Sequence, residues 1–117
     1  MIFRKSSEIL PVVKEKARGG EGRMITYPFV TEQEAHGAGR LFSKLILPAG
    51  SSIGMHEHVG EFEIYYVLAG QGVVNDGERE YAIAPGDMYL CDDGEKHSLQ
   101  NGGAEDLVLI AIIPFVK

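Results

Sequence analysis

A chain of 117 residues can bury one hydrophobic core but not two, so we expect a single domain. Its composition, 44% hydrophobic and 24% charged, excludes a disordered or fibrous protein. The net charge of −6 argues against a nucleic-acid partner, because binding to phosphates needs clustered Lys and Arg. We see no signal-peptide core and no apolar run long enough to span a membrane, and Cys91 is the only cysteine. We therefore expect a cytoplasmic protein without a membrane partner.

The charge is unevenly distributed along the chain. Residues 1–23 carry a net charge of +3, which leaves −9 on residues 24–117. We therefore divide the chain into an N-terminal arm or edge segment, residues 1–23, and one barrel domain, residues 24–117. The arm is either solvated and partly mobile, or it docks on its own acidic barrel or on a second subunit.

Taken in chain order, the sequence predicts short strands separated by turns. Residues 7–16 fit a short helical turn or an edge strand, and residues 17–22 have the composition of a flexible loop. Strands are expected at 24–27, 41–47, 63–68, 73–74, 81–83, 88–91 and 107–113, with a hairpin turn at Asp76-Gly77. Residues 107–113 are apolar throughout, which suits a strand buried on both faces or paired across a subunit interface. This spacing indicates an all-β sandwich or barrel.

Three of the four histidines fall into one pattern. His56 and His58 stand two residues apart, Glu63 follows, and His97 lies in a second block between Gly94 and Asn101. Residues two apart in a strand point to the same side, so both histidines of the first block can face a barrel interior. An unbroken strand would send the carboxylate to the opposite face. The intervening residues must therefore contain a turn or bulge, which Gly60 permits.

These four side chains are typical ligands of a divalent transition metal. Three neutral imidazoles and one carboxylate around such an ion leave a net charge of about +1, and an octahedral ion keeps two open positions. That charge favours small anions such as dicarboxylates, enolates or keto acids as ligands. The chemistry does not choose among them.

The two blocks resemble the paired motifs of the cupin superfamily. The first matches the pattern G-x5-H-x-H-x(3,4)-E-x6-G from Gly50 to Gly70, and the second matches G-x5-P-x-G-x2-H-x3-N, except that Asp92 replaces the usual proline. The resemblance implies an all-β, double-stranded β-helix (jelly-roll) barrel that binds one divalent metal ion per chain. It implies the metal ligands His56, His58, Glu63 and His97, and a structural role for Asn101. Neither the motif nor the spacing selects among Mn, Fe, Zn and Ni.

Function is less constrained than fold, because cupins host many reactions. Our first hypothesis is a metal-dependent enzyme that oxidises, decarboxylates or isomerises a small, anionic organic molecule. The alternative is a non-catalytic barrel that binds or senses a small molecule. Glu61 and Tyr65 are the candidate catalytic residues, and Glu57 is a further nearby carboxylate. The resemblance and the apolar segment 107–113 also predict a homodimer.

Overall fold

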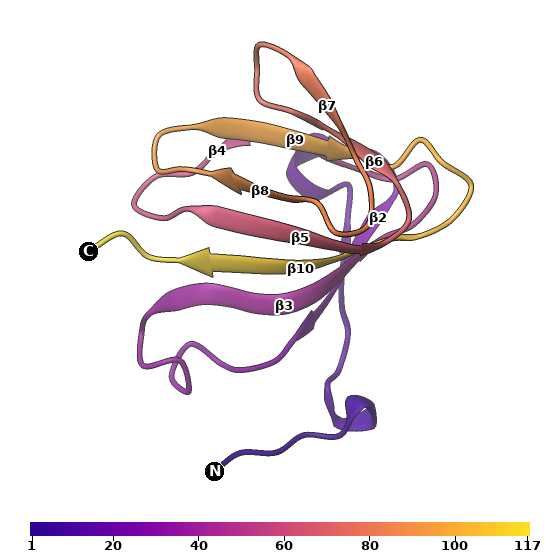
Figure 1. Cartoon of the computed structure of the whole chain (residues 1–117). Helices are drawn as coiled ribbons and strands as arrows, with labels where there is room; N and C mark the ends of the chain where they lie inside the picture. Colours follow the sequence, from indigo (N-terminus) through magenta and orange to yellow (C-terminus); the bar gives the residue numbers. More distant parts are fainter.

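Two antiparallel β-sheets face each other in the computed structural model, which describes residues 1–117 (Figure 1). The strands are β1 (Val12–Glu15), β2 (Arg23–Pro28), β3 (Gly39–Leu47), β4 (Ser52–Glu57), β5 (Glu63–Ala69), β6 (Gly72–Asn75), β7 (Glu80–Ile83), β8 (Met88–Cys91), β9 (Lys96–Gln100) and β10 (Leu107–Pro114). One sheet has the order β1-β2-β3-β10-β5-β8, and the other has the order β4-β9-β6-β7. This interleaving of strands from β3 to β10 is the jelly-roll arrangement, so the predicted fold class is confirmed.

The core lies between the sheets and is built by alternation along the strands. In β10 the inward residues Leu107, Leu109 and Ala111 are fully buried, while the residues between them are only partly buried. The strand lies in the middle of the six-stranded sheet, between β3 and β5. Of the two possibilities that the sequence left for this segment, burial on both faces does not hold within one chain, because one sheet face packs on the core and no second layer covers the other. Pairing across a subunit interface stays a prediction.

The predicted strands all appear: the strand at 88–91 has the predicted bounds, and the others extend by a residue or two at one or both ends. The ambiguous segment 7–16 contains both predicted elements, a 3₁₀ turn (Ser6–Glu8) and the edge strand β1, which pairs with β2. Strands β4 and β9 carry His56 and His97, and the sequence indicated these strands only through the two motifs. Their assignment to the smaller sheet depends on pairing between distant segments.

The segment 17–22, predicted as a flexible loop, is packed against the exposed edge of β4. It contains a 3₁₀ turn (Ala17–Gly19) in which Ala17 is fully buried. The Glu21 backbone N–H donates to the Ser52 hydroxyl at 2.9 Å, and the Ser52 N–H donates to the Glu21 carbonyl at 2.9 Å. A Cβ atom at Gly20 or at Gly54 would collide with the backbone of the opposite segment, so glycine at both positions allows this close approach.

Candidate metal centre

The two motifs deliver their side chains from neighbouring strands at one end of the barrel. His56 lies directly opposite His97 in the antiparallel pairing of β4 with β9, after an irregularity in that pairing which follows Ile53. His58 comes just after β4, and Glu63 is the first residue of β5. Between them Gly60 has a φ of +75° and reverses the chain. The predicted turn at this glycine is confirmed, and it returns Glu63 to the side of the histidines.

The loops that carry the two motifs are also tied to each other. The Gly60 N–H donates to a carboxylate oxygen of Asp93 at 2.7 Å, and the Gly94 N–H donates to the His58 carbonyl at 2.7 Å. The His58 N–H in turn donates to the Glu95 carbonyl at 3.0 Å. Three hydrogen bonds of this kind fix the position of one loop relative to the other, and so fix the distance between their metal-ligating side chains.

One potential ligand atom from each of His56, His58, Glu63 and His97 lies within 4.8 Å of every other. The Nε2 atoms of His58 and His97 are 3.0 Å apart, and each lies 3.1 Å from the same Glu63 oxygen. His58, Glu63 and His97 are buried, whereas His56 is partly exposed. The four predicted ligands are therefore positioned to hold a metal ion that solvent or a ligand would reach beside His56.

The second nitrogen of each imidazole has its own partner, which orients the ring. His56 Nδ1 lies 2.8 Å from the Gly54 carbonyl and His58 Nδ1 lies 2.6 Å from the Glu61 carboxylate, so both nitrogens donate. His97 Nδ1 lies 3.1 Å from the Tyr89 hydroxyl, which can donate or accept. Protonation at Nδ1 leaves Nε2 with a free lone pair, and this pair is the one that a metal binds.

The electrostatics of the cluster suit a cation. Burial alone would raise the pKa of Glu63, but hydrogen bonds with His58 and His97 outweigh it and lower the pKa to about 2. Burial lowers the pKa of His56 to about 4. At neutral pH the cluster thus offers a carboxylate and a neutral, partly exposed imidazole. When the Nε2 atoms carry no proton, their lone pairs and the carboxylate oxygen repel each other unless a cation lies between them, so the residues fit a divalent metal.

Glu61, predicted as a candidate catalytic acid or base, has both carboxylate oxygens engaged. Arg40 donates to them from Nε and Nη2, each at 2.7 Å, and His58 Nδ1 is bound to one of them. The hydrogen bonds from Arg40, followed by those from His58, lower the pKa of Glu61 to about 2. A carboxylate held this way is suited to orienting His58. The catalytic role of Glu61 stays a prediction.

Tyr65, the other candidate catalytic residue, is 2% exposed, and its ring lies 4.9 Å from that of Tyr89 and 5.7 Å from that of His97. Burial raises the pKa of both tyrosines well above the usual value, so both hydroxyls stay protonated at neutral pH. Burial also raises the pKa of Cys91 to about 12, which leaves no thiolate nearby.

Sequence reasoning missed two residues of this centre. Tyr89 contacts His97, and its inward position in the predicted strand 88–91 was the available signal. Arg40 lies 21 residues before Glu61, and nothing in the local sequence pairs the two. Asn101 does have the expected structural role, because its buried side-chain amide donates to the Leu47 carbonyl at 2.8 Å and to the Glu105 carbonyl at 2.7 Å.

Comparison with known proteins agrees with this geometry. The family model described as "Cupin domain" matches residues 43–113. The oxalate-binding protein of Thermotoga maritima is 43% identical over 109 residues, which cover 93% of this chain and 90% of that protein. A crystal structure described as a predicted oxalate decarboxylase from Thermotoga maritima superposes with a TM-score of 0.92 at 42% identity and covers 99% of this chain and 100% of that one.

More distant structures share the fold alone. Ectoine synthase from P. lautus is 19% identical, with a TM-score of 0.77 over 97% of this chain and 78% of its own.

The match to the family model and the similarity to the oxalate-binding protein show that the chain belongs to the cupin family. None of its helices is long and apolar enough to cross a membrane.

The ligand assignment predicts the loss of metal on substitution. Replacing both His56 and His58 with alanine should abolish stoichiometric metal, measured by inductively coupled plasma mass spectrometry. The same variant should have a lower melting temperature than the metal-loaded wild type, because a metal that binds only the folded state stabilises it. One equivalent of metal retained by the double variant would contradict the assignment.

The contact between Glu61 and His58 predicts a smaller effect on metal affinity. Glu61→Ala leaves His58 Nδ1 without its partner, and loss of such a partner raises the dissociation constant of the metal about 10- to 100-fold. Glu57→Ala is the matched control, since Glu57 is a nearby exposed carboxylate on β4. Titration with a competing chelator measures both constants. Equal affinities in the Glu61→Ala variant and the wild type would exclude an orienting role.

Proposed function

We propose that this protein binds a divalent metal ion through His56, His58, Glu63 and His97 and uses the open positions of that ion to bind a small dicarboxylate such as oxalate. The observation that carries the proposal is the convergence of three imidazoles and one carboxylate, with access beside the partly exposed His56. A divalent ion in this set keeps a net charge of about +1 and can chelate two oxygens of one ligand. The similarity to an oxalate-binding protein supports this ligand class.

Binding, the alternative in our sequence-based hypotheses, has more support than a reaction that moves a proton. A general acid or base works best with a pKa near the pH of the medium. Around the metal centre, the pKa of Glu61 is about 2 and that of Cys91 about 12, while the pKa of Tyr65 is raised well above 10.0. Each of these groups holds its protonation state across neutral pH. These three groups would therefore not exchange the proton that decarboxylation or isomerisation needs, and His58, whose pKa is raised by its hydrogen bond with Glu63, would be occupied as a metal ligand.

An enzymatic function is the second candidate. A structure that superposes with a TM-score of 0.92 is described as a predicted oxalate decarboxylase. Oxidation would need a redox-active metal such as iron, and decarboxylation would need a proton for the product. The metal, when bound, would supply Lewis-acid stabilisation of the developing negative charge. Glu61 and Tyr65 remain the candidate catalytic residues for such a reaction.

Calorimetric titration of the manganese-loaded protein with oxalate tests the proposal. We expect oxalate to bind the loaded protein with one site per chain and to show no binding to the metal-free protein. Succinate, whose carboxylates are too far apart for a five-membered chelate ring, is the control and should bind much more weakly. Equal oxalate affinity with and without metal would contradict binding at the ion. Accumulation of formate from oxalate would instead support the decarboxylase candidate.

We further propose that the protein is a homodimer formed by the outer face of the six-stranded sheet. Strand pairing places Tyr66 beside Met88 and Ile110, and Ile64 beside Leu90. Tyr66 is 46% exposed, Met88 56% and Leu90 46%. A contiguous apolar face across β10, β5 and β8 of this kind is rare on a monomer. It suits a second copy of the same chain, since a two-fold axis places the same apolar patch of both subunits in contact.

A cytoplasmic location also stays a prediction.

Light scattering coupled to size-exclusion chromatography tests the dimer. The wild type should have twice the mass of one chain, and a Tyr66→Glu, Leu90→Glu double variant should have the mass of one chain, because a dimer would bury two charges in an apolar contact. Met55→Glu, on the exposed face of the smaller sheet, is the control and should leave the mass unchanged. A wild type with the mass of one chain would contradict the proposal.

A further inference from the structure

The turn at residues 17–19 holds an unusual backbone conformation. Arg18 has φ 55° and ψ 31°, and Lys16, just before the turn, has φ 48° and ψ 50°. Both lie in the left-handed region, where a residue with a Cβ atom is disfavoured by about 1–2 kcal/mol. Such conformations persist only where packing holds them, and they concentrate at functional sites. The burial of Ala17 between these two residues provides that packing.

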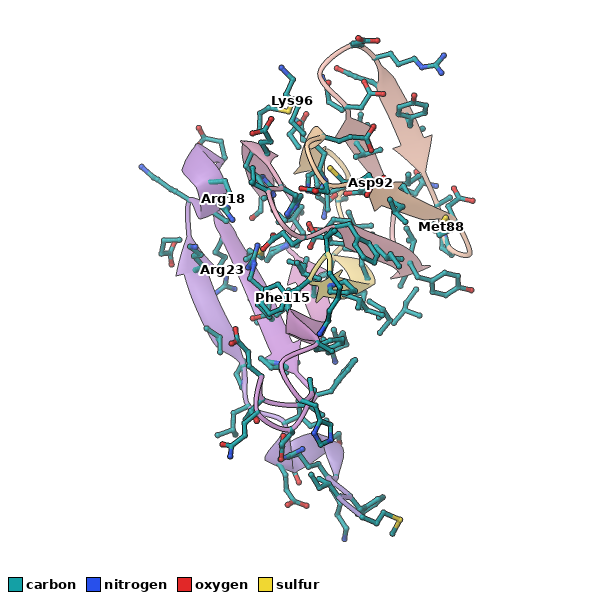
Figure 2. All side chains as sticks on the ribbon, turned by 90° about the vertical axis from the view of Figure 1, so that its left-hand side faces the viewer. Arg18, Arg23, Met88, Asp92, Lys96 and Phe115 are labelled. Carbon is teal, nitrogen blue, oxygen red and sulfur yellow. The ribbon has the colours of Figure 1, made fainter.

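This turn lies beside the strand that carries His56. The carbonyl oxygen of Arg18 approaches Gly54 so closely that a Cβ there would collide with it. The carbonyl oxygen of Gly54 accepts the hydrogen bond from His56 Nδ1. The backbone of Arg18 therefore contacts Gly54, and the carbonyl of Gly54 orients His56, the most accessible of the four metal ligands. Figure 2 looks at this end of the barrel and shows Arg18 and Arg23 on one side of it, with Asp92 on the other.

The side chain of Arg18 is exposed and makes no hydrogen bond or ion pair within the chain. The turn that carries Arg18 packs against Gly54, whose carbonyl orients His56. An unpaired guanidinium on this segment is available to an anionic ligand at the metal.

Arg40, another cation near the centre, is already engaged, because it gives two hydrogen bonds to Glu61. The aliphatic part of Lys96 lies over Gly77, where an added Cβ would meet it, and its side chain belongs to the outward-facing set of β9. Arg18 differs from Arg40 in having a free charge, and from Lys96 in lying on the segment that packs against Gly54.

We propose that Arg18 selects for doubly charged ligands by contacting the second carboxylate of a dicarboxylate held at the metal. This inference rests on the proposed function. The charges agree with it, since a divalent ion with one carboxylate ligand contributes about +1 and the guanidinium adds another +1, matching a dianion such as oxalate. The planar fork of guanidinium hydrogen-bond donors also matches a carboxylate geometrically.

The test compares a dianion with a monoanion on the manganese-loaded protein. Arg18→Asn removes the charge and suits the left-handed backbone, since asparagine is enriched there. We expect its dissociation constant for oxalate to rise about 10-fold or more, the range of one lost charge-assisted contact. The constant for glycolate, which chelates with one charge, should change by less than about 3-fold. Arg18→Lys, which keeps the charge, should lose less oxalate affinity than Arg18→Asn.

Lys14→Gln is the matched control, because Lys14 is an exposed cation on β1 in the same N-terminal segment. It should bind oxalate as the wild type does, and all three variants should take up one equivalent of manganese. An unchanged oxalate constant in Arg18→Asn, or an equal loss for oxalate and glycolate, would overturn the role of Arg18. A wild type that binds no oxalate would refute the proposed function itself. This outcome is measured on the wild-type protein alone, so it is distinguishable from a failure of the role of Arg18.

Discussion

The repulsion among converging ligand atoms is the constraint on which the metal centre depends. The Nε2 atoms of His58 and His97 lie 3.0 Å apart, and both meet the same oxygen of Glu63. Such an arrangement is favourable only with a cation or a shared proton between the atoms. Folding must therefore supply the energy that holds the side chains together before a metal arrives, and the paired strands β4 and β9, with the hydrogen-bonded loops at their ends, do so.

The partners of the imidazole Nδ1 atoms explain how the cluster stays ready for a metal. A backbone carbonyl holds His56, a carboxylate holds His58 and a tyrosine hydroxyl lies against His97. These contacts direct the Nε2 atoms inward. The same arrangement engages the carboxylate of Glu61. Because Arg40 and His58 both bind it, this carboxylate is poorly placed to exchange protons with a ligand.

The N-terminal segment gains a role that its composition alone did not indicate. The sequence distinguishes residues 1–23 by their positive charge and leaves open whether this arm is solvated or docked. In the structure, β1 extends the edge of the larger sheet, and the following turn packs on the edge of β4 in the smaller sheet. The segment therefore links the two sheets on the side of the barrel that carries His56. The net charge of +3 on this segment offsets part of the −9 on the rest of the chain.

The sequence by itself indicated an all-β sandwich or barrel, because strand and turn signals are local. The jelly-roll fold and the metal-ligand set followed from the resemblance of its two motifs to those of the cupins. The separation of His56 and His58 fits one face of a strand, and Gly60 can adopt the positive φ that returns Glu63 to that face. Tertiary structure decided the contacts of Arg40 with Glu61, of Tyr89 with His97 and of Arg18 with Gly54. It also left the outer face of β10 open, although the apolar sequence suggested burial on both sides. These features join segments far apart in the chain, and no local pattern specifies which distant segments the pairing of strands will bring together.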